Sequence, residues 1–134
     1  MPKQRGFYNS RHSRRKNKYG VSAEELRTYN GITFDSKAEM LRYTHLLLLQ
    51  KAGAIQNLEL QPHFELIPAF QRRKHKYRAM CYTADFRYQE FGNTIVEDVK
   101  GVKTKDYEMR KKAFIYLYPD IVFREVHNSE IKDY

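Results

Sequence analysis

The chain has 134 residues, a formal net charge of +9 and one cysteine, Cys81. This length predicts one domain with a modest core, and the basic balance indicates a polyanionic partner. A single cysteine excludes an internal disulfide, the apolar run at 46–50 is too short to cross a bilayer, and no apolar stretch follows the basic N-terminus as in a signal peptide. We therefore expect a cytoplasmic protein without membrane contact.

Residues 1–18 are expected to form a flexible basic arm, and residues 19–134 the single domain. The arm holds seven Lys and Arg and no acid, so that the rest of the chain carries only +2. A basic arm on a nearly balanced domain is typical of nucleic-acid-binding proteins. A solvated tail that adds solubility is the alternative interpretation of the arm taken alone.

The first predicted helix spans residues 36–53, after a turn and a short extended piece at 29–36. Ser36 supplies an N-terminal cap and Gly53 ends the helix. Its apolar positions recur at helical spacing: Leu41, His45, Leu48 and Leu49.

Three strands are predicted to follow this helix, at 63–70, 80–91 and 94–101. The strongly basic run QRRKHKYR at 71–78 connects the first two strands. Gly92 and Asn93 give the signal of a two-residue hairpin loop between the other two strands.

A second helix over 105–118 is capped by Thr104 and stopped by Pro119, and a last strand covers 120–126. Its apolar face is predicted from four residues: Met109, Ala113, Tyr116 and Leu117. The order helix, three strands, helix, strand predicts an α/β domain around a small mixed sheet.

The predicted hairpin gathers three charged residues on one face of the sheet. With a loop at Gly92-Asn93, Asp85 lies opposite Lys100 and Arg87 lies opposite Asp98. Because side chains alternate along a strand, Asp85, Asp98 and Lys100 project from one face and Glu97 projects from the other. The two aspartates are then diagonal neighbours, with backbones about 7–8 Å apart.

Two carboxylates this close repel each other, and a divalent cation removes that conflict. Mg²⁺ is held by one or two carboxylates with phosphate oxygens and water, and a lysine within reach stabilises phosphoryl charge or helps to orient and deprotonate a water. Asp85, Asp98 and Lys100 therefore suit metal-assisted phosphodiester hydrolysis. The spacing equally allows a structural face, in which Lys100 pairs with Asp85 and Arg87 pairs with Asp98.

These residues resemble the motif of the PD-(D/E)XK nuclease superfamily: an aspartate, then Asp98-Val99-Lys100 after a gap, with an acid in a preceding helix. The stretches GITFDSKAEMLRY, LELQPHFELIP, YTADFRY, VEDVKG and YPDIVFREV are similar to a family of small phage and prophage proteins without assigned function, over nearly all of 29–126. The resemblance implies a restriction-endonuclease-like core. Ala84 stands where the superfamily has its nominal proline.

The resemblance also implies roles for single residues. Mg²⁺, or Mn²⁺ in its place, would be held by four of them: Glu39, Asp85, Asp98 and Val99. Lys100 would support the nucleophilic water, so that the catalytic set is Glu39, Asp85, Asp98 and Lys100. Glu39 has an alternative role, because Ser36 to Glu39 has the pattern of a capping box.

Three basic groups are predicted to hold the DNA backbone. The arm contributes Arg14, Arg15 and Lys16, and the connection contributes Arg72, Arg73, Lys74, Lys76 and Arg78. The region of the second helix contributes Lys103, Lys105, Arg110, Lys111 and Lys112. Such contacts position DNA without reading its sequence. Three tyrosines are candidates to stack on unpaired bases, with ordinary packing as the alternative: Tyr77, Tyr82 and Tyr107.

We therefore expect a metal-dependent, structure-selective DNA endonuclease that cuts branched DNA in phage recombination or replication. The resemblance to Holliday-junction resolvases implies a homodimer, because two strands must be cut, and a place in the cytoplasm of a bacterial host. Two alternatives stay open. One is a non-catalytic nucleic-acid-binding accessory protein with a structural ion-pair face. The other is a virion protein whose basic arm neutralises packaged DNA.

Overall fold

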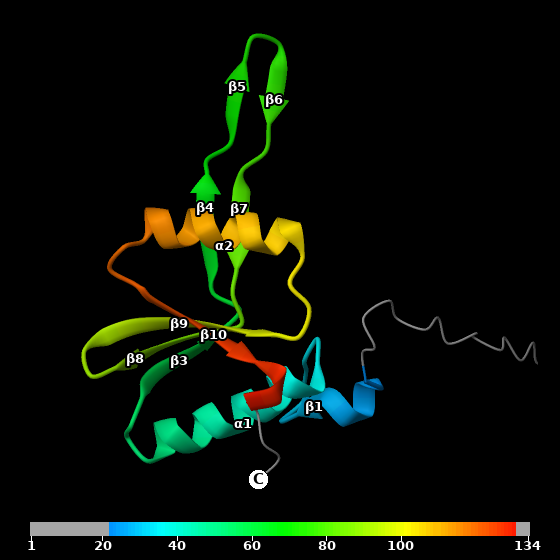
Figure 1. The fold of residues 1–134 in the computed structure, drawn as a ribbon, viewed down its shortest axis with the longest axis vertical. Helices are drawn as coiled ribbons and strands as arrows, with labels where there is room; N and C mark the ends of the chain where they lie inside the picture. Colours follow the sequence, from blue (N-terminus) through cyan, green and yellow to red (C-terminus); the bar gives the residue numbers. More distant parts are fainter. Residues whose placement is uncertain (1–21, 131–134) are drawn as a thin grey trace, which may run out of the picture.

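The computed structural model describes residues 22–130 and shows a mixed α/β fold (Figure 1). The basic arm at 1–18, with Arg14, Arg15 and Lys16, lies outside the described residues. A 3-10 helix (Glu24–Arg27) and a small hairpin of β1 (Thr28–Tyr29) and β2 (Ile32–Thr33) begin the described chain. Within 22–130, no helix is long and apolar enough to cross a membrane.

Helix α1 (Lys37–Lys51) begins where the sequence predicts, because the Ser36 hydroxyl accepts a hydrogen bond of 3.1 Å from the backbone N–H of Glu39. Its buried residues differ from those at the predicted spacing: they are Glu39, Tyr43 and Leu46. Leu48 is exposed. The run of four leucines provides more than one apolar face, and packing on the sheet selects the face that carries Tyr43.

The central sheet has the strand order β10-β9-β8-β3, with β10 parallel to β9 and the other neighbours antiparallel. Its strands are β3 (Gln56–Leu60), β8 (Phe86–Glu90), β9 (Asn93–Lys100) and β10 (Val122–His127). Strand β3 was not predicted from the sequence, since this edge strand has no buried residue and no clear alternation.

The predicted strand at 80–91 is two strands, β7 (Met80–Thr83) and β8, which belong to different sheets. The chain passes from one sheet to the other at Ala84 and Asp85. Strand β7 pairs with β4 (His63–Ile67) in a two-stranded ribbon. The predicted strand at 63–70 therefore lies outside the central sheet, where β3 takes its place.

The basic run at 71–78 is not a simple connection but forms most of a second hairpin. Strand β5 (Phe70–Arg72) pairs with β6 (His75–Tyr77) around a two-residue loop. Figure 1 shows this hairpin extending the β4–β7 ribbon beyond the second helix, away from the rest of the molecule. Every residue from 68 to 79 is exposed.

Helix α2 (Lys105–Leu117) is capped as predicted, because the Thr104 hydroxyl accepts a hydrogen bond from the Tyr107 backbone N–H. Its predicted apolar face is wrong. Tyr107 and Phe114 are buried, whereas Met109 and three neighbours on the predicted face are less buried: Ala113, Tyr116 and Leu117. The buried face contacts the β4–β7 ribbon, which the sequence analysis had not paired with this helix.

Two apolar clusters lie on opposite faces of β9. The cluster under α1 includes Tyr43, Leu46, Phe86, Tyr88, Ile95 and Val99, and the cluster under α2 includes Phe64, Tyr82, Val96, Tyr107 and Phe114. Ile95 and Val96 enter different clusters because successive side chains on a strand point to opposite faces. Strand β9 thus separates the two apolar clusters, so that Glu97 faces the cluster under α1, and Asp98 and Lys100 face the cluster under α2.

Candidate functional site

The β8–β9 hairpin turns one position earlier than the sequence predicts. Its loop residues are Phe91 and Gly92, with positive φ values of 49° and 77°. The facing pairs are Phe86 with Glu97, Arg87 with Val96, and Tyr88 with Ile95. A loop with two residues at positive φ favours the twist of a hairpin, but phenylalanine is an unusual residue for it.

The predicted pairings of Asp85 with Lys100 and of Arg87 with Asp98 are therefore wrong. Arg87 instead donates to Glu59 on β3, with Nε 2.9 Å from Oε2. The register differs from the prediction by two residues, and a shift of two keeps every side chain on its predicted face. Asp98 and Lys100 still share one face of β9, with Lys100 Nζ 3.3 Å from Asp98 Oδ1.

Asp85 is fixed at the point where the chain leaves β7 for β8. Its backbone N–H donates to the Glu97 carbonyl (3.2 Å), and its own carbonyl accepts from the Gln61 N–H (2.9 Å). Its carboxylate Oδ2 accepts from the backbone N–H of Val99 at 2.7 Å. Backbone and side chain are both tied to neighbouring strands, so the carboxylate has a defined position beside β9.

Three carboxyl groups meet at this point, because Asp85 lies within hydrogen-bonding reach of both Glu39 and Asp98. Burial is the largest cause and raises the pKa of all three groups. Among the contacts between them, Glu39 further raises the pKa of Asp85, and Asp85 further raises the pKa of Asp98. Lys100 opposes the rise in the pKa of Asp98. Raised pKa values are expected for buried carboxyl groups with too little positive charge nearby, and a bound cation would lower these pKa values.

Asp98 is only 1% exposed and is incompletely paired. Its Oδ2 accepts from the hydroxyl of Tyr82, whereas its Oδ1 has no hydrogen-bond donor among the described residues. Lys100 Nζ is near that oxygen, and it also lies 4.4 Å from the centroid of the Tyr107 ring. A buried carboxylate oxygen without a donor is costly and indicates room for a further ligand.

Glu97 shows the opposite situation on the other face of β9. It is fully buried and accepts from the Arg42 guanidinium through both oxygens, and the Tyr88 hydroxyl donates to its Oε2 at 2.6 Å. The prediction that strand alternation turns Glu97 away from Lys100 is confirmed. Glu97 is a structural acid with complete partners.

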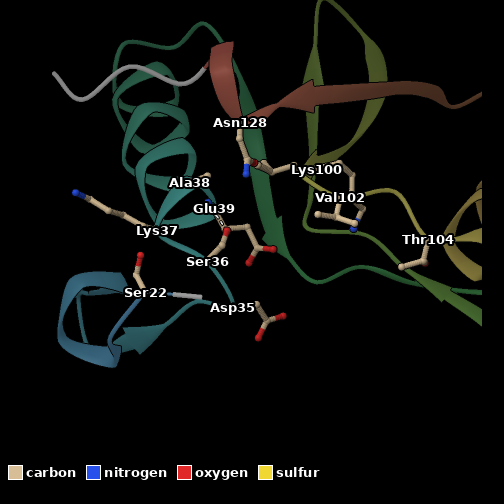
Figure 2. A pocket seen from close by; sticks show the side chains of 12 residues that line it. Ser22, Asp35, Ser36, Lys37, Ala38, Glu39, Lys100, Val102, Thr104 and Asn128 are labelled. Atoms are coloured by element: carbon tan, nitrogen blue, oxygen red, sulfur yellow. Dashed lines mark hydrogen bonds between the residues drawn. The ribbon is translucent and has the colours of Figure 1, made fainter. Parts of the chain in front are cut away.

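Two hollows adjoin the carboxyl cluster. The larger, of about 480 Å³, is lined by Glu39, Val99 and Lys100 together with Asp35 and the start of α1 (Figure 2). The smaller, of about 160 Å³, is lined by Glu39 and Asp85. Asp35 was not singled out in the sequence, although an acid four residues before Glu39, just ahead of the cap, is a signal that could have been used. Its charge also raises the pKa of Glu39, after burial.

The four residues of the proposed motif are thus brought together. The backbone N–H of Glu39 makes the capping bond to the Ser36 hydroxyl, while its carboxyl group interacts with Asp85 and with the backbone of Asp35. The predicted capping-box bond from that carboxyl group to the Ser36 N–H is not observed among the described residues. Among residues 22–130, no group of three or more His, Cys, Asp and Glu side chains has the geometry of a metal site. A pair of carboxylates is nevertheless a sufficient protein contribution for Mg²⁺, which keeps water and phosphate oxygens as its other ligands.

The cations predicted to hold DNA fall into two groups. Those of the β5–β6 hairpin have no carboxylate partner within the described chain: Arg72, Arg73, Lys74, Lys76 and Arg78. Near α2, Lys103 and Lys111 both pair with Glu125, and Arg110 pairs with Asp106. Lys105 and Lys112 are exposed. Paired cations contribute less to a field that attracts phosphate.

Of the three tyrosines proposed to stack on bases, only one has an accessible ring. Tyr82 and Tyr107 are buried in the cluster under α2, so stacking on a base is wrong for both. Tyr77 lies on the exposed hairpin.

No curated protein and no solved structure matches the chain. A family model described as "Protein of unknown function (DUF1064)" matches residues 16–131. The match contains the whole carboxyl cluster, the β5–β6 hairpin and both long helices. The chain therefore belongs to the DUF1064 family.

Proposed function

We propose that the protein is a metal-dependent, structure-selective DNA endonuclease with a restriction-endonuclease-like core of the PD-(D/E)XK type. One observation carries the proposal. Asp85 and Asp98 lie together beside Lys100 and Glu39, with their pKa values raised and one Asp98 oxygen lacking a donor among the described residues. A divalent cation would relieve the repulsion and bind the Asp98 oxygen that now has only the Lys100 ammonium group nearby.

The order of elements supports the same proposal. Helix α1, the antiparallel strands β3, β8 and β9, helix α2 and the parallel strand β10 follow the predicted order, once β3 replaces the strand expected at 63–70. The β4–β7 ribbon and its hairpin are then an insertion between the first two core strands. An insertion at this place leaves three acids close together: Glu39 on α1, Asp85 just before β8, and Asp98 on β9.

Each residue of the cluster has a role in this proposal. Mg²⁺, with Mn²⁺ as a substitute, would be held by Asp85, Asp98 and the carbonyl of Val99, with Glu39 completing the site. When bound, the metal supplies Lewis-acid activation of the phosphate and of a water. Lys100 holds and orients the attacking water, and Tyr82 and the Val99 N–H keep the two aspartates in place.

The proposed substrate class follows from the exposed cations, because these contact phosphates and the proposal includes no residue that recognises base sequence. Phosphate contacts from the β5–β6 hairpin, with Lys105 and Lys112, select DNA by shape, at junctions, forks or flaps. We place this activity on phage or prophage DNA in the cytoplasm of a bacterial host. A homodimer would supply one site for each strand of a junction.

The test is cleavage of a labelled four-way junction, a fork and a linear duplex of the same sequences, with Mg²⁺, Mn²⁺ or EDTA. Lys100→Ala and Asp98→Asn are compared with Lys51→Ala, an exposed lysine at the end of α1 that serves as control. Metal-dependent cutting that is lost in the first two variants and kept in the control supports the proposal. Binding without cutting on every substrate, unchanged in the variants, would instead identify a non-catalytic accessory protein.

A further inference from the structure

The hairpin at 68–79, which we call the finger, has a firm base and a free tip. At its base, Phe64 and Tyr82 of the β4–β7 ribbon pack on Phe114 of α2, with ring centroids 4.7 and 5.2 Å apart. Beyond the base, every residue is exposed. Figure 1 shows β5 and β6 projecting past α2 without a neighbouring element. The finger thus has a fixed attachment to the domain but makes no contribution to its core.

The finger is strongly and uniformly basic. Its twelve residues contain five Lys and Arg and no acid. None of these cations has a carboxylate partner within residues 22–130, unlike the lysines around Glu125. Five unpaired cations on one narrow ribbon repel each other in the free protein, and a polyanion would relieve that repulsion.

An aromatic pair lies between the domain and the four cations nearest the tip. Phe70 and Tyr77 face each other across the two strands, with ring centroids 4.8 Å apart and an interplanar angle of 11°. The residues are 48% and 49% exposed, so that each ring covers one face of its partner and leaves surface free. Exposed aromatic faces beside cations are the arrangement that binds unpaired bases, since every base has a face to stack.

The loop at the tip is also unusual. Arg73 has a φ of 56°, in the left-handed region that favours glycine, at the first position of a two-residue loop. A glycine would fit this position with less strain, yet the chain has an arginine there. The turn therefore does not require an arginine, and the residue places a positive charge at the tip.

We propose that the finger enters a DNA branch point, where its cations contact the phosphates of the diverging strands and the Phe70–Tyr77 pair stacks on a base exposed at the branch. This inference rests on the proposed function in that it names the feature by which the substrate is selected. A two-stranded ribbon also fits the major groove of a duplex. Bases within a duplex are stacked on one another, however, and offer no face to the aromatic pair.

The test measures binding in EDTA, so that cutting does not interfere. Substrates are a fork and a linear duplex of equal length, each with 2-aminopurine at the position of the branch. We expect the wild-type protein to bind the fork at least tenfold more tightly and to change the 2-aminopurine fluorescence only there. Equal affinity for both substrates, or no fluorescence change on the fork, would overturn the inference.

Three variants assign the effect to the finger. Phe70→Val with Tyr77→Val replaces the aromatic pair by a β-branched pair, which also suits paired strands. It should lower affinity for the fork about tenfold or more, while binding to the duplex is kept. Arg73→Gly suits the turn and should reduce the slope of log Kd against log salt by about 0.9. Phe91→Asn is the control, because Phe91 is a 93% exposed aromatic with positive φ at the tip of the other hairpin. It should leave both affinities unchanged.

The two proposals fail in different ways. If Lys100→Ala and wild type both fail to cut while their preference for the fork persists, the nuclease proposal is lost and the role of the finger stands. If the double valine variant keeps the full preference for the fork and a wild-type melting temperature, the role of the finger is lost, whatever the result for cleavage.

Discussion

Glu97 and Asp98 are neighbours on β9, but their surroundings differ completely. Under α1, Glu97 has a bidentate arginine and a tyrosine hydroxyl, so that every oxygen is paired and the charge is neutralised. Under α2, Asp98 meets another aspartate, one lysine and one tyrosine, and an oxygen has no donor among the described residues. Burial alone therefore does not distinguish the two acids, whereas the completeness of their partners does.

The largest expected effect is on cleavage and comes from changing Asp98 or its neighbour Lys100. Lys100→Ala or Asp98→Asn should reduce metal-dependent cleavage by about 10²–10⁴-fold, because in the proposed site Lys100 orients the water and Asp98 holds the metal. Single-turnover cutting of a four-way junction measures this. Unfolding curves recorded alongside should show folded proteins, and a variant that cuts at the wild-type rate would contradict the assignment.

Around Glu97, where the acid is fully paired, the expected effect is on stability. Arg42→Met leaves Glu97 buried without its cation and should lower the free energy of unfolding by about 3–5 kcal/mol, measured by urea titration. Arg87→Met removes a comparable arginine–glutamate pair that is exposed and should cost less than about 1 kcal/mol. Similar losses in the two variants would remove the distinction between buried and exposed pairs.

Metal binding should stabilise the folded protein through the carboxyl cluster around Asp98 and not through Glu97. At a Mg²⁺ concentration ten times the Kd, the wild-type protein should gain about 1.4 kcal/mol, read as a rise in the melting temperature. Asp98→Asn should show no such gain, and without metal it should melt at or above the wild-type temperature because it lacks one of the repelling charges. Arg42→Lys, which keeps the cation, is the matched variant on the other face and should respond to Mg²⁺ as wild type does.

The smallest expected effect comes from Asp35, at the rim of the larger hollow. Asp35 is exposed, and its side chain acts on Glu39 through its charge, whereas its backbone bond to Glu39 is kept in the variant. Asp35→Asn should therefore change cleavage by about two- to fivefold. A loss as large as that of Asp98→Asn would instead place Asp35 among the metal ligands. Glu24→Gln, an exposed acid on the preceding 3-10 helix, is a suitable control.

Local signals in the sequence predicted where the two helices begin, but not which of their faces are buried. The caps at Ser36 and Thr104 give the helix starts directly, because capping depends on residues within one turn. Which face is buried depends on the partner. The run of leucines in α1 and the scattered aromatics of α2 allow several faces, and the contact of α2 with the β4–β7 ribbon could not be read from either segment.

The candidate site was predicted despite a wrong register. The loop at Phe91–Gly92 was missed, since phenylalanine rarely adopts positive φ, but a shift of two residues preserves the faces. Asp85 was placed inside a continuous strand, whereas it lies at a junction between sheets. The pairing of Lys103 and Lys111 with Glu125 joins residues distant in sequence and could not be foreseen.

The ribbon that bears the finger runs directly into the site, because β7 ends just before Asp85. Tyr77 and Asp85 are eight positions apart in the chain, which at ~3.3 Å per residue spans at most roughly 26 Å, or about eight base pairs. In the proposed function, the ribbon would therefore set the distance between the branch point and the scissile phosphate. Two residues added to each strand would preserve the facing side chains and move the cut by about two nucleotides, whereas one residue would turn the aromatic pair to the opposite face.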